Sequence, residues 1–236
     1  VAGQAYRRPL TEAEAKELRG LYSRLREQEI PHNDAFRLTL ARVLVSPAFL
    51  YRIEIPGPGA GQGPVSDFEL ANRLSYFLWS SQPDDELRQL ATAGKLSDPA
   101  ILKQQTRRML KSEKTRRLAT EFACQWLHIH DFEHLDEKSE RHFPTFAGLR
   151  GAMYEESIQF FTDLFQNDGS VTGILDADYT FLNEDLAKHY GIAGVTGADW
   201  RRVEGVKKSG RGGILAQATT LATQSGASRT SPILRG

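Results

Sequence analysis

Apolar residues recur every three or four positions over most of this chain, which is the spacing of amphipathic helices. Thr11 and Glu14 form a capping box at the start of the first such run. A second, more apolar run starts at Asn33 or Asp34 and ends before Pro47, because proline fits the first turn of a new helix but not the interior of an old one. The pattern predicts an N-terminal helical hairpin.

The central part of the chain shows helix start and stop signals in regular succession. Ser66 and Glu69 form a second capping box, and Gly94 closes a short helix. Asn183 is expected to cap a later helix, with Gly191 as the left-handed residue that follows it. The remaining helices are predicted over residues 99–111, 112–129 and 145–166.

Two details of these helices are open to a structural check. In the helix over residues 112–129, one apolar face is predicted to contain Leu118, Phe122, Gln125, Trp126 and Ile129. In the helix over residues 145–166, Glu155 and Glu156 are interpreted as a pair of acids on a solvated face, within reach of a basic partner.

Strand signals are few and are confined to the C-terminal part. WRRVEGV, residues 200–206, is compatible with a strand, and residues 212–226 with either a helix or an extended buried segment. No internal repeat is present. The expected fold is mostly α, a multi-helix orthogonal bundle with a small irregular or short-strand C-terminal part.

A Gly/Pro-rich stretch suggests how the chain is divided. Residues 56–64 read PGPGAGQGP, a composition typical of a loop. We therefore expect four parts. They are an N-terminal helical hairpin domain (1–55), a Gly/Pro loop (56–65), a central helical domain (66–195) and the start of a further domain (196–236).

Composition excludes several classes of function. The 30 basic residues balance the 30 acidic ones, so no broad attraction to nucleic acid is expected. Cys124 is the single cysteine, which rules out an internal disulfide and a CxxCH haem site within this segment. The most apolar run, residues 38–51, contains Arg42 and Pro47, so we expect no membrane-spanning helix. The ends of the chain carry no leader or terminal cap, and we expect a longer parent protein.

Residues 128–134 read HIHDFEH and hold the candidate metal ligands His128, His130 and His134. Imidazoles and carboxylates suit zinc, iron or copper, which would allow a metal-dependent hydrolase. On a helix, however, residues two apart point nearly opposite ways, so His128 and His130 would diverge. If the helix ends by His130, then His130, Glu133 and His134 could converge. The spacing favours a solvated helix end over a metal site.

Two features near the C-terminus are compatible with ligand binding. His189 lies in the last turn of its predicted helix, where the helix dipole is expected to raise its pKa. Gly210, Gly212 and Gly213 surround Arg211 and could form an anion-binding backbone nest. The structural alternatives are helix capping for His189 and a turn-rich connection for the glycines.

Several longer stretches together resemble a known group of domains. They are YRRPLTEAE (6–14), FELANRLSYFLWSSQPDDEL (68–87) with TAGKLSDP (92–99), FACQWL (122–127), LDADYTFLNEDLAKHYGI (175–192) and RGGILAQATTLATQSGASRTSPILRG (211–236). In this order they resemble the uncharacterised helical domains of large exported planctomycete-type proteins that also carry c-type cytochrome modules.

The resemblance implies an exported protein, periplasmic or associated with the cell envelope. It implies haem c elsewhere in the parent protein and no cofactor in this segment, with the cytochrome module and neighbouring domains as partners in electron transfer. No catalytic role is assigned to the matching positions. The candidate site residues among them are His189, Tyr179, Arg211, Gln217, Arg229, Thr230 and Arg235.

Three functions follow as hypotheses, and metal-dependent hydrolysis at residues 128–134 is the least favoured of them. The first is a helical scaffold or docking module of the cytochrome c-associated redox protein. The second is the catalytic domain of an exported oxidoreductase that acts on an extracellular substrate. A pocket lined by His189, Tyr179, Arg211 and Arg229 would favour the second, and a flat, ion-paired surface would favour the first.

Overall fold

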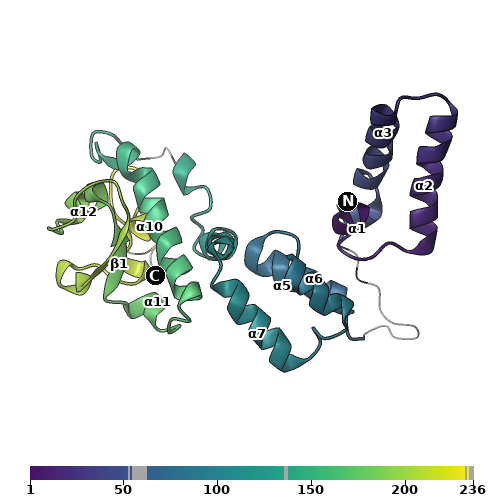
Figure 1. The fold of residues 1–236 in the computed structure, drawn as a ribbon. Helices are drawn as coiled ribbons and strands as arrows, with labels where there is room; N and C mark the ends of the chain where they lie inside the picture. Colours follow the sequence, from purple (N-terminus) through teal and green to yellow (C-terminus); the bar gives the residue numbers. More distant parts are fainter. Residues whose placement is uncertain (53, 55–62, 136–137, 232, 234–236) are drawn as a thin grey trace. The chain divides into compact units, whose positions relative to one another are not determined.

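The computed structural model describes residues 1–52, 54, 63–135, 138–231 and 233. Within these residues the chain is mostly helical and holds one two-stranded antiparallel sheet, which confirms the predicted fold class (Figure 1). The described helices include none that is both long and apolar enough to cross a membrane. Two compact units are present: Val1–Phe77 with Ser81–Thr106, and Leu78–Ser80 with Arg107–Gly236.

The N-terminal helices of the first unit form the predicted hairpin. The capping box is confirmed, because Thr11 Oγ1 accepts from the amide of Glu14 at 3.2 Å and Glu14 Oε2 accepts from the amide of Thr11 at 2.8 Å. The next helix begins at His32, earlier than predicted, and has no side-chain cap. Pro47 opens a new helix as expected. The elements are α1 (Ala2–Ala5), α2 (Glu12–Glu27), α3 (His32–Leu44) and α4 (Pro47–Leu50).

The later helices of the first unit follow their predicted signals. The second capping box is present, with Ser66 Oγ accepting from the amide of Glu69 at 3.3 Å and Glu69 Oε2 accepting from the amide of Ser66 at 2.7 Å. The elements are α5 (Asp67–Trp79), α6 (Asp85–Thr92) and α7 (Pro99–Leu110), and the last residues of α5 and α7 belong to the second unit. The predicted Gly/Pro loop lies largely outside the described residues, and the predicted division into four parts stays a prediction.

The segment before the histidine-rich stretch departs from a regular helix. It contains η1 (Glu113–Thr115), α8 (Arg116–Leu118), a π-helical segment η2 (Ala119–Ala123) and α9 (Cys124–Trp126). Because a π turn holds more residues than an α turn, the buried positions shift. Leu118, Ala119, Ala123 and Cys124 are buried, while Phe122 and Trp126 are 50% and 52% exposed. The prediction that Phe122 and Trp126 share the buried face is therefore wrong.

The core of the second unit forms around α10 (Phe146–Gln166), shown in green in Figure 1. This helix contacts β1 (Tyr179–Leu182), α12 (Glu184–Tyr190) and α13 (Ala218–Thr223). β1 pairs with β2 (Arg201–Glu204) from Tyr179↔Glu204 to Leu182↔Arg201. The strand in WRRVEGV is thereby confirmed. The short connecting elements are η3 (Phe132–His134), α11 (Gly173–Asp176), η4 (Val206–Ser209) and η5 (Ile214–Ala216).

Two glycines let the chain after β2 pass close to α11. A Cβ atom added to Gly212 would lie 2.3 Å from the carbonyl oxygen of Ala177, and one added to Gly213 would lie 2.1 Å from that of Leu175. Both glycines also have positive φ, at +116° and +64°. Close backbone packing accounts for both glycines, and it positions the segment that carries Arg211.

Candidate functional site

A buried carboxylate at the centre of the second unit was missed by the sequence interpretation. Glu156 is 1% exposed, and its Oε1 and Oε2 accept from Thr180 Oγ1 at 2.6 Å and from the Tyr190 hydroxyl at 2.5 Å. The expectation of a solvated acid pair is wrong for Glu156, although Glu155 does bind Arg116. One signal was available: Glu156 is four residues from Phe160, on the same helical face.

Burial sets the protonation of this carboxylate. Loss of solvation raises the pKa of Glu156 to about 7. The hydrogen bonds from Thr180 and Tyr190 and the charge of Arg211 lower this pKa, but by less than burial raises it. Burial, and after it the charge of Glu156, raises the pKa of Tyr190 well above its ordinary value. The phenol therefore stays protonated and acts as a donor to Glu156.

Tyr190 connects the buried carboxylate to Arg211. Its hydroxyl accepts from the amide of Ala218 at 2.8 Å, and the Arg211 guanidinium lies 3.9 Å from the centre of its ring. Arg211 Nη1 also donates to the carbonyl oxygen of Ala216 at 3.0 Å. An aromatic face and a backbone carbonyl thus orient the guanidinium, and the bonds to Glu156 and Ala218 hold the aromatic ring in place.

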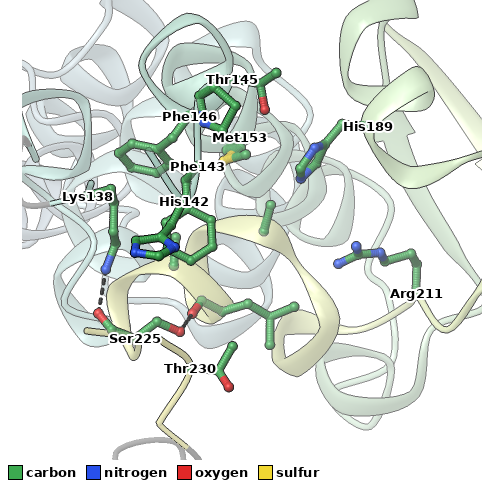
Figure 2. Close-up of a pocket in the computed structure, with 14 residues that line it drawn as sticks. Lys138, His142, Phe143, Thr145, Phe146, Met153, His189, Arg211, Ser225 and Thr230 are labelled. Carbon is green, nitrogen blue, oxygen red and sulfur yellow. Dashed lines mark hydrogen bonds between the residues drawn. The ribbon is translucent and has the colours of Figure 1, made fainter. Parts of the chain in front are cut away.

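Beside Arg211 the second unit has a cavity of about 470 Å³ (Figure 2). Basic side chains reach it from several segments: Lys138, His142, His189 and Arg211. None of the fourteen described residues that line it is acidic. Much of the rest of the wall is apolar, with Phe143, Phe146, Met153, Leu221 and Ala222. The volume lies within the range of small-molecule sites, about 300–1,000 Å³.

His189 stands at the edge of this cavity, from the last turn of α12. The residue is exposed, but the imidazole is partly covered by its neighbours. That burial and, to a lesser degree, the positive charge of Arg211 lower the pKa of His189. The expectation of a raised pKa at the helix end is wrong, because desolvation and a neighbouring cation outweigh the helix dipole. His189 is therefore mainly neutral at pH 7 and can accept or donate a hydrogen bond.

The predicted site residues are placed as follows. Three of them, His189, Arg211 and Thr230, line the same cavity. Gln217 is 2% exposed beside it, where its Oε1 accepts from Ser157 Oγ at 2.8 Å. Tyr179 lies on β1, away from the cavity lining, with the Arg202 guanidinium 3.4 Å from its ring centre.

The remaining two arginines differ in what the structure describes of them. Arg229 is exposed and does not line the cavity. Arg235 lies outside the described residues. The cavity thus takes its basic character partly from His142 and Lys138, which the sequence interpretation did not select because neither lies in a stretch that carries the family resemblance.

The histidine-rich stretch forms part of a different, open depression. His128, His130 and Asp131 line it, whereas His134 does not. His128 has a φ of +57°, so the helix has ended before the histidines begin. Across the described residues, no group of three or more His, Cys, Asp or Glu side chains is placed to hold a metal ion.

Comparisons with known proteins identify two domain families. The model described as "Protein of unknown function (DUF1595)" matches residues 1–54, and the one described as "Protein of unknown function (DUF1592)" matches residues 65–192. Neither the curated proteins nor the solved structures contain a match to the chain. The DUF1592 match includes Glu156 and His189 and covers more than half of the chain. The chain therefore belongs to the DUF1592 family of proteins of unknown function.

Proposed function

We propose that this chain is the substrate-binding domain of an exported oxidoreductase that also carries a c-type cytochrome. The observation that carries the proposal is the cavity of about 470 Å³ in the second unit, with basic groups and an apolar wall converging on it. Concave apolar sites with a few convergent polar groups are the usual form of small-molecule sites. The exported setting and the haem module elsewhere in the parent protein rest on the resemblance described above.

The proposed division of labour follows from the residues present. A histidine with a lowered pKa and an oriented arginine can bind and position a substrate and can shift a proton at His189. Electron transfer would belong to the haem of the parent protein, since this segment lacks the cysteine pair that covalent haem attachment requires. The chain therefore supplies recognition in this proposal, and the cytochrome module supplies redox chemistry.

A blocked cavity tests the proposal. Thr230 is exposed and lines the cavity, so Thr230→Trp should obstruct it without disturbing the core, whereas Ser228→Trp places the same side chain nearby, off the lining. A library of small organic fragments is screened by saturation-transfer NMR against the three proteins. Fragments that bind the wild type and Ser228→Trp but not Thr230→Trp support the proposal. A library with no such fragment would contradict it.

A docking role is the second candidate, favoured by a different observation. Phe122 and Trp126 lie four residues apart in the helical segment η2–α9 and are 50% and 52% exposed. Exposed aromatic pairs are typical of protein interfaces. If the cytochrome module docks there, Trp126→Ala in the parent protein should increase protease cleavage between the modules, with Leu175→Ala, also exposed, as the control. Equal cleavage in both variants would argue against docking.

A further inference from the structure

We infer that the ligand of this cavity is a monocarboxylate with an apolar body, an inference that rests on the proposed binding function and specifies its ligand class. The first argument is charge. Arg211 and Lys138 line the cavity with His142 and the mainly neutral His189, and no acidic side chain among the described residues lines it (Figure 2). The Lys138 ammonium donates to the carbonyl oxygens of Ser225 and Gly226, so Arg211 is the main source of positive charge for a ligand. A cavity with cationic groups and no carboxylate favours an anion over a neutral or cationic ligand.

The second argument is the state of Arg211. Among the described residues, its guanidinium forms no ion pair within 4.0 Å, and its one hydrogen bond to a described residue goes to the carbonyl of Ala216. Glu156, the acid behind it, is occupied by Thr180 and Tyr190. The guanidinium is planar and held against the Tyr190 ring, so its remaining N–H groups keep a fixed direction. Two neighbouring N–H groups of a guanidinium can donate in parallel to the two oxygens of one carboxylate.

The third argument is the rest of the lining. Phe143, Phe146, Met153 and Leu221 supply an apolar wall, to which a small inorganic anion or a sugar would present no matching surface. In Figure 2 the guanidinium of Arg211 and the imidazole of His189 lie on one side of the cavity, and the rings of Phe143 and Phe146 lie on the other, beside Lys138 and His142. The Lys138 ammonium is already bonded to backbone carbonyl oxygens. Arg211 opposite the aromatic rings fits a molecule that is charged at one end and apolar at the other, such as an arylalkanoic acid.

A matched pair of probes tests the charged end. The affinities of 3-phenylpropionate and of its neutral amide, 3-phenylpropanamide, are measured by titration calorimetry on the intact chain. We expect the acid to bind at least about tenfold more tightly than the amide, since charge-assisted hydrogen bonds are roughly twice as strong as neutral ones. Equal affinity for acid and amide would overturn the inference and leave a binding cavity in place.

A matched pair of variants locates the charged end. Arg211→Gln should weaken the binding of 3-phenylpropionate by about tenfold or more and the binding of the amide by clearly less, because the guanidinium forms its stronger hydrogen bonds with the carboxylate. Arg229→Gln makes the same change of charge at an exposed residue off the lining, and should change neither affinity by more than about twofold. If Arg211→Gln fails to fold, the comparison of acid and amide on the wild type decides alone. If neither probe binds, the inference about the ligand class fails. The proposed binding function fails as well only if the fragment screen described above also finds no ligand.

Discussion

The hydroxyl of Tyr190 donates a 2.5 Å hydrogen bond to the buried carboxylate of Glu156. The same hydroxyl accepts from the amide of Ala218 at 2.8 Å, so one phenol oxygen connects α12 to α10 and to the start of α13. Arg211 rests on the face of that ring. The wall of the proposed binding site is thereby attached to the core of the second unit.

Tyr190→Phe should destabilise the protein. The change leaves the Ala218 amide and one Glu156 oxygen buried without their partner, and unsatisfied buried polar groups cost about 1–3 kcal/mol each. We expect the free energy of unfolding in urea to fall by about 2–4 kcal/mol. Tyr51→Phe, at a residue 64% exposed, should change it by less than about 0.5 kcal/mol. Indistinguishable unfolding curves for the two variants would mean that the hydrogen bonds of Tyr190 contribute little.

The raised pKa of Glu156 makes stability depend on pH. Its pKa is about 7 in the folded chain, against an ordinary value of 4.5 that holds in the unfolded chain. Between these values the folded chain binds more protons than the unfolded chain, so the free energy of unfolding falls as the pH rises. The stabilisation is fully present below pH 4.5 and is lost as the pH passes through about 7. The total loss is on the order of 3 kcal/mol.

Glu156→Gln isolates this effect, because the amide is neutral at every pH and Thr180 can accept a hydrogen bond from it. Urea unfolding of both proteins is followed from pH 4.5 to 8. The wild type should lose stability relative to the variant over that range, by on the order of 3 kcal/mol. Parallel profiles would show that Glu156 does not change protonation on folding.

Gly213→Ala should be far more harmful than Gly210→Ala. The two glycines have nearly the same φ, but Gly210 (ψ 23°) is left-handed, whereas Gly213 (ψ 166°) lies in a region that essentially only glycine adopts, so the backbone already disfavours an alanine more at Gly213. At Gly213 the new Cβ would lie 2.1 Å from the Leu175 carbonyl oxygen, while at Gly210 nothing lies within 4 Å. The clash adds about 1–3 kcal/mol to the loss of unfolding free energy. Equal losses for both would contradict the close packing of this segment on α11.

Phe122→Ala should lower the free energy of unfolding only slightly, even though the helical spacing of Phe122 in the sequence predicts a core residue. Phe122 is 50% exposed, so truncation should lower the free energy of unfolding by about 1 kcal/mol or less. Phe160 on α10 is fully buried, and Phe160→Ala should cost about 3–5 kcal/mol. Thermal or urea unfolding of the two variants checks the contrast. A large loss for Phe122→Ala would mean that the regular α-helical register, not the π turn, describes the segment.

The sequence by itself determined the helices whose ends carry their own signals. The capping boxes at Thr11 and Ser66, and the Asn183 cap, formed as predicted. Gly191 also took the left-handed conformation expected of it, with a φ of +69°. These signals act within one helical turn, so no distant part of the chain is needed to make them effective. Three of the candidate site residues could likewise be selected from the family-like stretches, and they line one cavity.

Only the tertiary structure decided how Glu156, the π turn and the cavity are arranged. The partners of Glu156 are Thr180 and Tyr190, 24 and 34 residues away, and nothing in the neighbourhood of Glu156 predicts them. The π-helical segment η2 packs against α10, which lies far from it in the sequence. Periodicity assumes a regular helix and treats a carboxylate as solvated. Long-range packing overrides both assumptions, because burying a polar group depends on partners that only the folded chain supplies.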